Sequence, residues 1–296
     1  LADRKLFTPS SLKAAVRIKT ASSGKVKKMT KQQLKLDAKK RLGPDGKQLP
    51  LWVRRPALEM EKDIERKRRI ANKIAASLLQ KRIKAGVKVT DEDVVTCLRA
   101  WGFVRNEQRK NVLPAGTDFV NSDTLGLNCA RDQKVRVTGA SQRHPDMTRL
   151  LNRWLADHWP EGLAQDFPFT SISVNSNYNA RRHRDGGNEG PSLIKAFGQF
   201  TGGRLAYWPD DDRSVKIEDL KPAQSVLYNV RAKTVTFNGK RAHEVTPFKG
   251  ERFSLVFFTC ARYWKALSNQ NKLAESLGFH VPTDASLKAA RAVVSM

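Results

Sequence analysis

Apolar and polar residues recur with two different periods along this chain, and these periods divide it into a helical part and a β-rich part. Apolar residues at helical spacing predict a long helix over residues 56–85. A second helix is predicted within 90–103, where Thr90 is a suitable N-cap. An amphipathic pattern predicts a third helix within 144–160.

Short β-rich runs follow from residue 169 onward. Gly, Pro, Asn or Asp residues separate them, as expected of an antiparallel barrel or double sheet. The runs are 169–176, 192–200, 203–209, 225–230, 234–239 and 251–260. A last helix over 262–279 is predicted to close the fold.

Two short stretches inside the β-rich part have ordinary structural interpretations. Gly202-Gly203 predicts a hairpin turn, because glycine adopts positive φ without steric cost. Tyr207 and Trp208 follow on a strand, and we favour a core position for them over a groove in which they would stack on a substrate.

Positive charge is concentrated at the amino-terminal end. The 296 residues carry a formal net charge of +26, and residues 1–90 hold 26 Lys and Arg against 7 Asp and Glu, a balance of +19. Residues 1–50 contain too few apolar side chains to offset the entropy of ordering, so we predict a basic, partly disordered arm. The excess favours contact with phosphate groups over a solvated salt-bridged surface.

Other features limit the class of protein. Cys97, Cys129 and Cys260 form no CxxC pair, which argues against a zinc ribbon or disulfide framework and favours a reducing compartment. No run of about 18 apolar residues and no signal-peptide pattern is present. We therefore expect an intracellular protein without a membrane partner. Because the first residue is Leu1, this chain can be a fragment.

A candidate metal site begins at "HRD". If His183 and Asp185 end a strand, the two-residue period turns both side chains to one face while Arg184 points away. Two histidines and one carboxylate are the usual ligands of non-haem iron(II), and His243, in "NGKRAHEV", is the candidate third ligand.

A second HxD triplet provides an internal comparison. His144-Pro145-Asp146 has proline at a first helical position and aspartate in the first turn, so it predicts the start of a helix and no metal site. We expect no catalytic role for His158 and His280 either.

A second pair of residues complements the metal triplet. Arg252 and Ser254, in "ERFSLVFF", alternate onto one face of a predicted strand. A buried guanidinium beside a hydroxyl is suited to binding a carboxylate, which suggests a dicarboxylic co-substrate.

The segments "HRDGGNEGPS", "GQFTGGRL", "NGKRAHEVTPFKGERFSLVFF" and "NSNYN" together resemble the iron(II)/2-oxoglutarate-dependent dioxygenases, in particular the TET/J-binding-protein-like branch. The resemblance covers residues 167–264. It implies an α+β fold with a double-stranded β-helix (jelly-roll, cupin-like) core and flanking helices. It also implies Fe(II) on His183, Asp185 and His243, with 2-oxoglutarate held by Arg252 and Ser254. Oxygen is the second co-substrate and ascorbate a candidate reductant.

Further site residues are expected from the flanking segments. Asn175, Asn177 or Tyr178, on the strand that enters the site, can reach the co-substrate, and Asn188 and Ser192 can touch the substrate.

The expected organisation is a basic arm over 1–55 and a basic helical region over 56–110. A dioxygenase domain over 111–280 and a tail over 281–296 follow.

The resemblance and the basic arm favour oxidation of a nucleic-acid base of the 5-methylpyrimidine type, with DNA favoured over RNA and a nuclear location in a eukaryote. Two alternatives remain open. One is a protein or peptide hydroxylase of the same fold, and the other is a nucleic-acid-binding protein with a degenerate oxygenase fold and no turnover.

Overall fold

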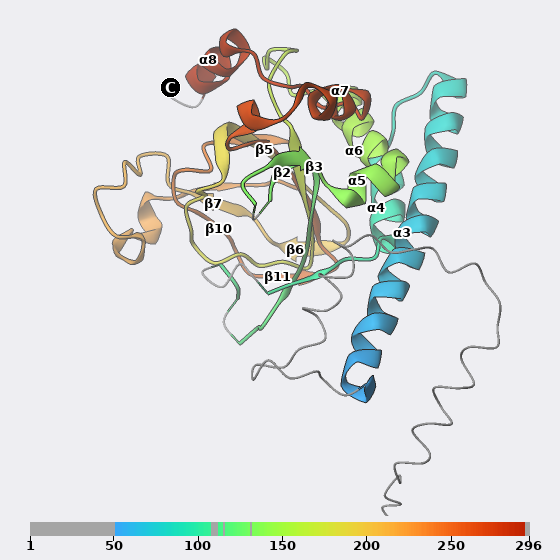
Figure 1. The fold of residues 1–296 in the computed structure, drawn as a ribbon. Coiled ribbons are helices and arrows are strands. Elements are labelled where there is room, and N and C mark those ends of the chain that lie inside the picture. The colour runs from blue at the N-terminus through green and yellow to red at the C-terminus, as the bar shows by residue number, and fades with distance from the viewer. Residues whose placement is uncertain (1–50, 108–111, 115, 131, 294–296) are drawn as a thin grey trace, which may run out of the picture. The chain divides into compact units, whose positions relative to one another are not determined.

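The computed structural model describes residues 51–107, 112–114, 116–130 and 132–293 (Figure 1), and only the backbone of residues 51–58. Most of the expected basic arm, residues 1–50, lies outside the described residues. The chain divides into two compact units, 1–59 and 60–296, and the strands found in the described residues belong to the second. No helix in the described ranges is long and apolar enough to cross a membrane.

Within the part of the chain that the structure describes, four helices precede or interrupt the early strands. They are α3 (Leu51–Ala85), α4 (Asp91–Ala100), α5 (Gly139–Arg143) and α6 (Pro145–Asp157). A capping box begins α4, because the Asp93 amide donates to the Thr90 hydroxyl at 3.2 Å and the Thr90 amide donates to the Asp93 carboxylate at 2.9 Å. Helix α6 has Pro145 in its first turn, which confirms that the HPD triplet starts a helix.

One sheet forms the larger layer of the core. Its order is β1-β2-β4-β12-β5-β9, with β3 paired to β2, and all of its strand pairs are antiparallel. The strands are β1 (Arg105–Asn106), β2 (Val120–Cys129), β3 (Val135–Val137), β4 (Ser171–Ser176), β5 (Asn188–Phe197), β9 (Val235–Phe237) and β12 (Phe253–Cys260).

A second sheet has the order β10-β7-β8, and His183 extends it through an isolated bridge to His243. Its strands are β10 (His243–Val245), β7 (Leu205–Tyr207) and β8 (Val226–Tyr228), and a separate pair is formed by β6 (Phe200–Gly202) and β11 (Phe248–Gly250). From β4 to β12 the chain passes repeatedly between the two sheets, as in a jelly roll. The α+β, double-stranded β-helix prediction is thereby confirmed.

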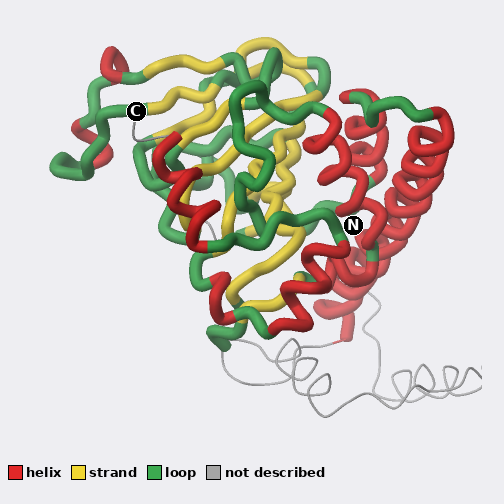
Figure 2. The backbone as a smooth tube through the Cα atoms, turned by 90° about the horizontal axis from the view of Figure 1, so that it is seen from above, coloured by secondary structure: helices red, strands yellow, loops and turns green. Residues whose placement is uncertain are grey.

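The two faces of the larger sheet have different environments. On β12, Phe253, Leu255 and Phe257 join one apolar cluster with residues of α3, α4 and α6, whereas Ser254 and Val256 on the opposite face line a cavity. Figure 2 shows several helices gathered on one side of the strands, with further helical segments elsewhere around them. The alternation of strand residues therefore separates a helix-packed core from a site-bearing interior.

Tyr207 and Trp208 are both buried, which confirms the predicted core positions. The hairpin predicted at Gly202-Gly203 is wrong, because β6 pairs with β11 and β7 pairs with β10 and β8. Both glycines do have positive φ, but they lie where the chain changes sheets. A Cβ on Gly203 would come within 2.9 Å of the Arg252 Nε, so this glycine makes room for a buried guanidinium.

The carboxy-terminal helix differs from its prediction. A single helix over 262–279 is replaced by a short 3-10 turn, η4 (Tyr263–Lys265), and a separate helix, α7 (Ser268–Ser276). Arg262 has a left-handed backbone conformation, with φ of 65°. A right-handed helix therefore cannot begin at this residue. The expected tail contains a further helix, α8 (Asp284–Val293), and two 3-10 turns, η2 (Ile217–Asp219) and η3 (Pro222–Gln224), lie between β7 and β8.

Candidate metal centre

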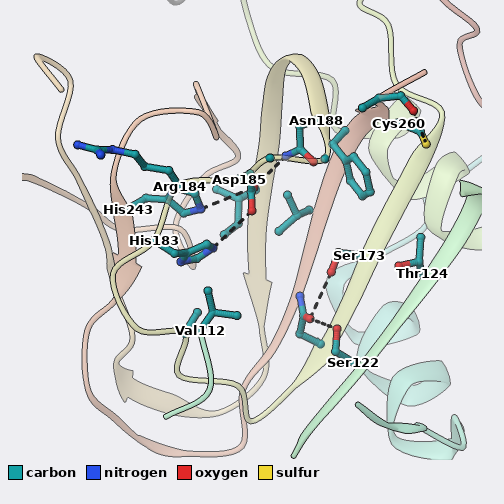
Figure 3. Close-up of a pocket in the computed structure, with 18 of the residues that line it drawn as sticks. Val112, Ser122, Thr124, Ser173, His183, Arg184, Asp185, Asn188, His243 and Cys260 are labelled. Atoms are coloured by element: carbon teal, nitrogen blue, oxygen red, sulfur yellow. Dashed lines mark hydrogen bonds and ion pairs between the residues drawn. The ribbon is translucent and has the colours of Figure 1, made fainter. Parts of the chain in front are cut away.

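The three predicted metal ligands come together on two adjacent segments (Figure 3). His183 and His243 are bridge partners, and the centroids of their rings lie 4.2 Å apart. The Asp185 amide donates to the Gly239 carbonyl at 2.8 Å, which fixes the third ligand against the segment that leads to His243. One ligand atom from each residue lies within 4.8 Å of the others, so one ion can reach all three.

Both imidazole rings are held in the same way. The Nδ1 of His183 lies 2.7 Å from the Arg181 carbonyl, and the Nδ1 of His243 lies 2.9 Å from the Arg241 carbonyl. Because a carbonyl only accepts, each Nδ1 carries the proton and each Nε2 presents a lone pair. These Nε2 atoms lie 3.5 and 3.8 Å from the Asp185 carboxylate oxygens, as expected for ligands that converge on one metal.

The Asp185 carboxylate is itself oriented by a neighbour. The Asn188 amide donates to its Oδ2 at 2.8 Å. A Cβ on Gly239 would approach the same oxygen to 2.9 Å, so a larger residue there would displace the carboxylate. The expectation that Asn188 touches substrate remains a prediction, since the contact seen here is to Asp185. A hydrogen-bonded network around the ligands is the usual way in which proteins orient a bound metal.

Two imidazoles and one carboxylate fit a divalent iron ion in a facial arrangement with free positions. Among the described residues, no other group of His, Cys, Asp and Glu can hold a metal. The other HxD triplet, His144-Pro145-Asp146, belongs to no such group. Its His144 packs edge-on against Trp101, with 5.7 Å between ring centroids.

Arg252 occupies an unusual position for a cation. Its side chain is only 1% exposed, and its Nε and Nη2 have no hydrogen-bond partner within the described part of the chain. Phe200 and Phe248 flank the guanidinium, each with its ring centroid 5.5 Å from Cζ. Burial lowers the pKa of Arg252 to about 10. A buried charge without a partner is costly, and a bound carboxylate would satisfy it.

A row of neutral polar side chains crosses the larger sheet and begins at Ser254, two residues after Arg252. Ser254 on β12 lies opposite Asn175 on β4, which lies opposite Ser122 on β2. The Ser122 hydroxyl donates to Asn175 Oδ1 at 2.7 Å, and Asn175 Nδ2 donates to the Ser254 hydroxyl at 3.4 Å. The predicted residues Asn175 and Ser254 are thus neighbours, and Ser122 is an addition that only strand pairing reveals. Whether Asn175 and Ser254 contact a co-substrate stays a prediction.

The metal ligands and the polar row line one cavity of about 710 Å³. Tyr178 also lines it, and its hydroxyl donates to the Val112 carbonyl at 3.3 Å. Asn177 instead accepts the Arg252 amide at 2.8 Å and so holds the start of β12. Ser192 is fully buried, and its hydroxyl accepts a hydrogen bond from the Asn188 amide at 3.4 Å. Its contact with substrate stays a prediction.

Comparison with known proteins gives structural neighbours only. No known protein family and no curated protein matches this chain in sequence. The chain is similar to the solved structure of NgTET1 in complex with 5mC DNA, with 16% identity over 52% of this chain and 69% of that chain, at a TM-score of 0.33.

Two further neighbours are a 2OG-Fe(II) oxygenase family oxidoreductase from Burkholderia pseudomallei and a prolyl hydroxylase from Trichoplax adhaerens solved with a hypoxia inducible factor peptide fragment. The first has 14% identity over 56% of this chain and 77% of its own, at a TM-score of 0.33. The second has 10% identity over 72% and 94%, at a TM-score of 0.32.

Proposed function

We propose that this chain is an iron(II)/2-oxoglutarate-dependent dioxygenase that hydroxylates a C–H bond, with a nucleic-acid base as its substrate. The observation that carries the oxygenase proposal is the combination of the His183, Asp185 and His243 cluster with the buried Arg252 guanidinium, whose Nε and Nη2 have no hydrogen-bond partner among the described residues. Neither the histidine and aspartate cluster nor the buried Arg252 has an obvious structural purpose without a ligand. Together they are complementary to a metal and to a dicarboxylate that chelates it.

When bound, iron(II) would activate oxygen and couple the oxidative decarboxylation of 2-oxoglutarate to hydroxylation of the substrate. One oxygen atom enters the substrate, the other enters succinate, and carbon dioxide leaves. The protein contributes position and charge. His183 and His243 present neutral nitrogens, Arg252 neutralises the distal carboxylate, and Ser254 adds a hydroxyl beside it.

The cavity is suited to a flat, neutral and polar substrate. Its volume of about 710 Å³ lies in the range of small-molecule sites and leaves room beside a co-substrate. Thr124 and Ser173 are cross-strand partners on the cavity wall, and Asn128 lies farther along β2. These side chains offer donors and acceptors without charge, which is suitable for reading the edge of an extruded base.

A cationic and aromatic segment adjoins the cavity. Arg262 lines the cavity and is exposed, and Trp264 and Lys265 follow it on η4. Trp264 is 61% exposed and packs edge-on against Tyr263, with 5.5 Å between ring centroids. An exposed indole between two cations can stack on a base while the cations contact phosphates. This segment supports a nucleic acid as the occupant, together with the charge of residues 1–90.

The test is succinate release in the presence of iron(II), 2-oxoglutarate and oxygen, with pools of DNA, RNA and peptides as separate additions. Release stimulated by nucleic acid, with an oxidised base found by mass spectrometry of the digested nucleosides, supports the proposal. Release that depends on peptides alone identifies a protein hydroxylase instead. Nucleic-acid binding without turnover, in protein saturated with iron, contradicts the enzyme assignment.

A further inference from the structure

Asp211 is a buried carboxylate in the segment between β7 and β8. Its side chain is fully covered, whereas its neighbours Asp210 and Asp212 in the "DDD" run are exposed. An ionised carboxylate is rarely buried without specific partners. Two partners of Asp211, Arg184 and Ala242, belong to the segments that carry the metal ligands.

The first partner lies between two ligands in the sequence. Arg184 separates His183 from Asp185, and its side chain points away from the cluster (Figure 3). Its Nε donates to Asp211 Oδ2 at 2.7 Å, and its Nη2 donates to Oδ1 at 2.5 Å. This two-pronged, charge-assisted contact fixes the guanidinium, and with it the backbone between the two ligands.

The second partner lies immediately before the third ligand. The Ala242 amide donates to Asp211 Oδ2 at 2.6 Å, and Ala242 precedes His243. The same oxygen therefore accepts a hydrogen bond from each of the two ligand segments. Glu244, next to His243, also joins the two segments through an ion pair with Arg182 at 3.3 Å, whereas Asp211 reaches both segments from outside them.

The β7–β8 segment makes another contact with the His243 segment. The Arg213 amide donates to Asp211 Oδ1 at 3.1 Å, and Arg213 Nε and Nη2 donate to the Lys240 carbonyl at 3.1 and 2.9 Å. Burial raises the pKa of Asp211, but the hydrogen bonds from Arg184, Ala242 and Arg213 outweigh this effect and hold the pKa below its usual range. The carboxylate is therefore charged at neutral pH.

We propose that Asp211 is a positioning residue for the metal centre, which holds the His183–Asp185 segment and the His243 segment at the separation that one metal ion requires. The backbone bridge between His183 and His243 sets their strand register. The hydrogen bond from the Asp185 amide to the Gly239 carbonyl and the ion pair between Arg182 and Glu244 at 3.3 Å also join the two segments. Asp211 adds a further restraint from outside both segments. The inference concerns metal binding and does not depend on the substrate proposed above.

The test is the affinity of the metal-free protein for Co(II), a stand-in for iron(II) that is stable in air, measured by titration at a temperature where each variant is folded. Asp211→Asn removes the charge and one acceptor. We expect the Kd for Co(II) to rise about 10- to 100-fold, as for loss of a group that orients metal ligands.

Asp93→Asn is the matched control. As whole residues, Asp93 and Asp211 are both 6% exposed. Asp93 also accepts two hydrogen bonds from one arginine, Arg82, at 2.8 and 3.0 Å, and one from a backbone amide. It lies on α4, among the helices. Its replacement should lower the melting temperature while the Kd for Co(II) stays within about twofold of the native protein.

Arg184→Lys is a second variant, which keeps the positive charge but cannot make the two-pronged contact. It should weaken Co(II) binding several-fold, and it decides the matter if Asp211→Asn does not fold. Native Co(II) affinity in Asp211→Asn, or in Arg184→Lys where only that variant folds, overturns the proposal, as does an equal loss in Asp93→Asn. A native protein that binds Co(II) but never consumes 2-oxoglutarate contradicts the proposed function alone.

Discussion

His183 and His243 are reciprocal backbone partners, each donating its amide to the carbonyl of the other at 3.0 Å. This single pair of hydrogen bonds places two ligands from distant parts of the chain side by side at the edge of the second sheet. Because each ring is also held through its Nδ1, backbone and side-chain hydrogen bonds together orient both histidines. Replacing residues near this pair should therefore change the affinity of the protein for a metal ion.

Replacing His183 or Asp185 by alanine should abolish both metal binding and 2-oxoglutarate consumption. Loss of one of three ligands should weaken Co(II) binding by more than about 100-fold, beyond the loss expected for an orienting group. His144→Ala is the comparison, since His144 belongs to the other HxD triplet and packs beside Trp101. It should leave Co(II) binding unchanged even if it lowers the melting temperature. Turnover by His183→Ala at the native rate would refute the ligand assignment.

Arg252→Met should separate stability from function. Methionine removes a buried charge that has two unpaired nitrogens, so the ligand-free protein should be stabilised by about 1–4 kcal/mol. The same change removes the partner of the distal carboxylate, a loss of about 1.5–3 kcal/mol. The KM for 2-oxoglutarate should therefore rise roughly 10- to 100-fold.

Thermal unfolding with and without 2-oxoglutarate checks both effects of Arg252→Met. The native protein should gain stability on adding 2-oxoglutarate in the presence of Co(II), and the variant should not. A variant that is less stable without ligand and still stabilised by 2-oxoglutarate would show that Arg252 is part of the core packing only.

Asn188→Ala should lower metal affinity by about tenfold, because Asp185 Oδ2 loses the amide that orients it. Ser192→Ala serves as the control, since its hydroxyl is buried and lies 3.4 Å from Asn188 rather than against a ligand. Titration of both variants with Co(II) shows whether metal affinity depends on Asn188. If Asn188→Ala binds Co(II) normally but raises the KM for the nucleic-acid substrate, the sequence-based interpretation of Asn188 as a substrate contact is the correct one.

The elements that repeat at a regular period could be predicted from the sequence. The helices at α4 and α6 and the run of strands from β4 to β12 follow local periodicity. The three residues of the metal cluster could be predicted because His183 and Asp185 form an HxD triplet followed by His243, and Arg252 because it forms an RxS triplet with Ser254. The proposed role of Asp211 could not be predicted from the sequence, because it depends on contacts with Arg184 and Ala242. These residues are distant in the sequence, and no local pattern indicates that they lie close together in the fold. Gly203 was misinterpreted for the same reason, since the contact that requires glycine is with the distant Arg252.

Trp264→Ala should weaken binding of single-stranded DNA if the segment after β12 holds nucleic acid as proposed. Loss of one stacked base costs about 1–3 kcal/mol, which corresponds to a rise in Kd of roughly 5- to 150-fold. Because the indole is uncharged, the dependence of Kd on salt should stay the same. Arg262→Ala should instead reduce the slope of log K against log salt by about 0.7.

Leu267→Ala is the matched control, since Leu267 lies just beyond η4, is 70% exposed and has no aromatic ring. It should bind DNA as the native protein does, and all three variants should bind Co(II) normally because none touches a metal ligand. Fluorescence anisotropy of a labelled oligonucleotide at several salt concentrations provides the measurement. Equal weakening by Trp264→Ala and Leu267→Ala would indicate a general apolar contact, and no weakening by Trp264→Ala would remove this segment from the nucleic-acid interface.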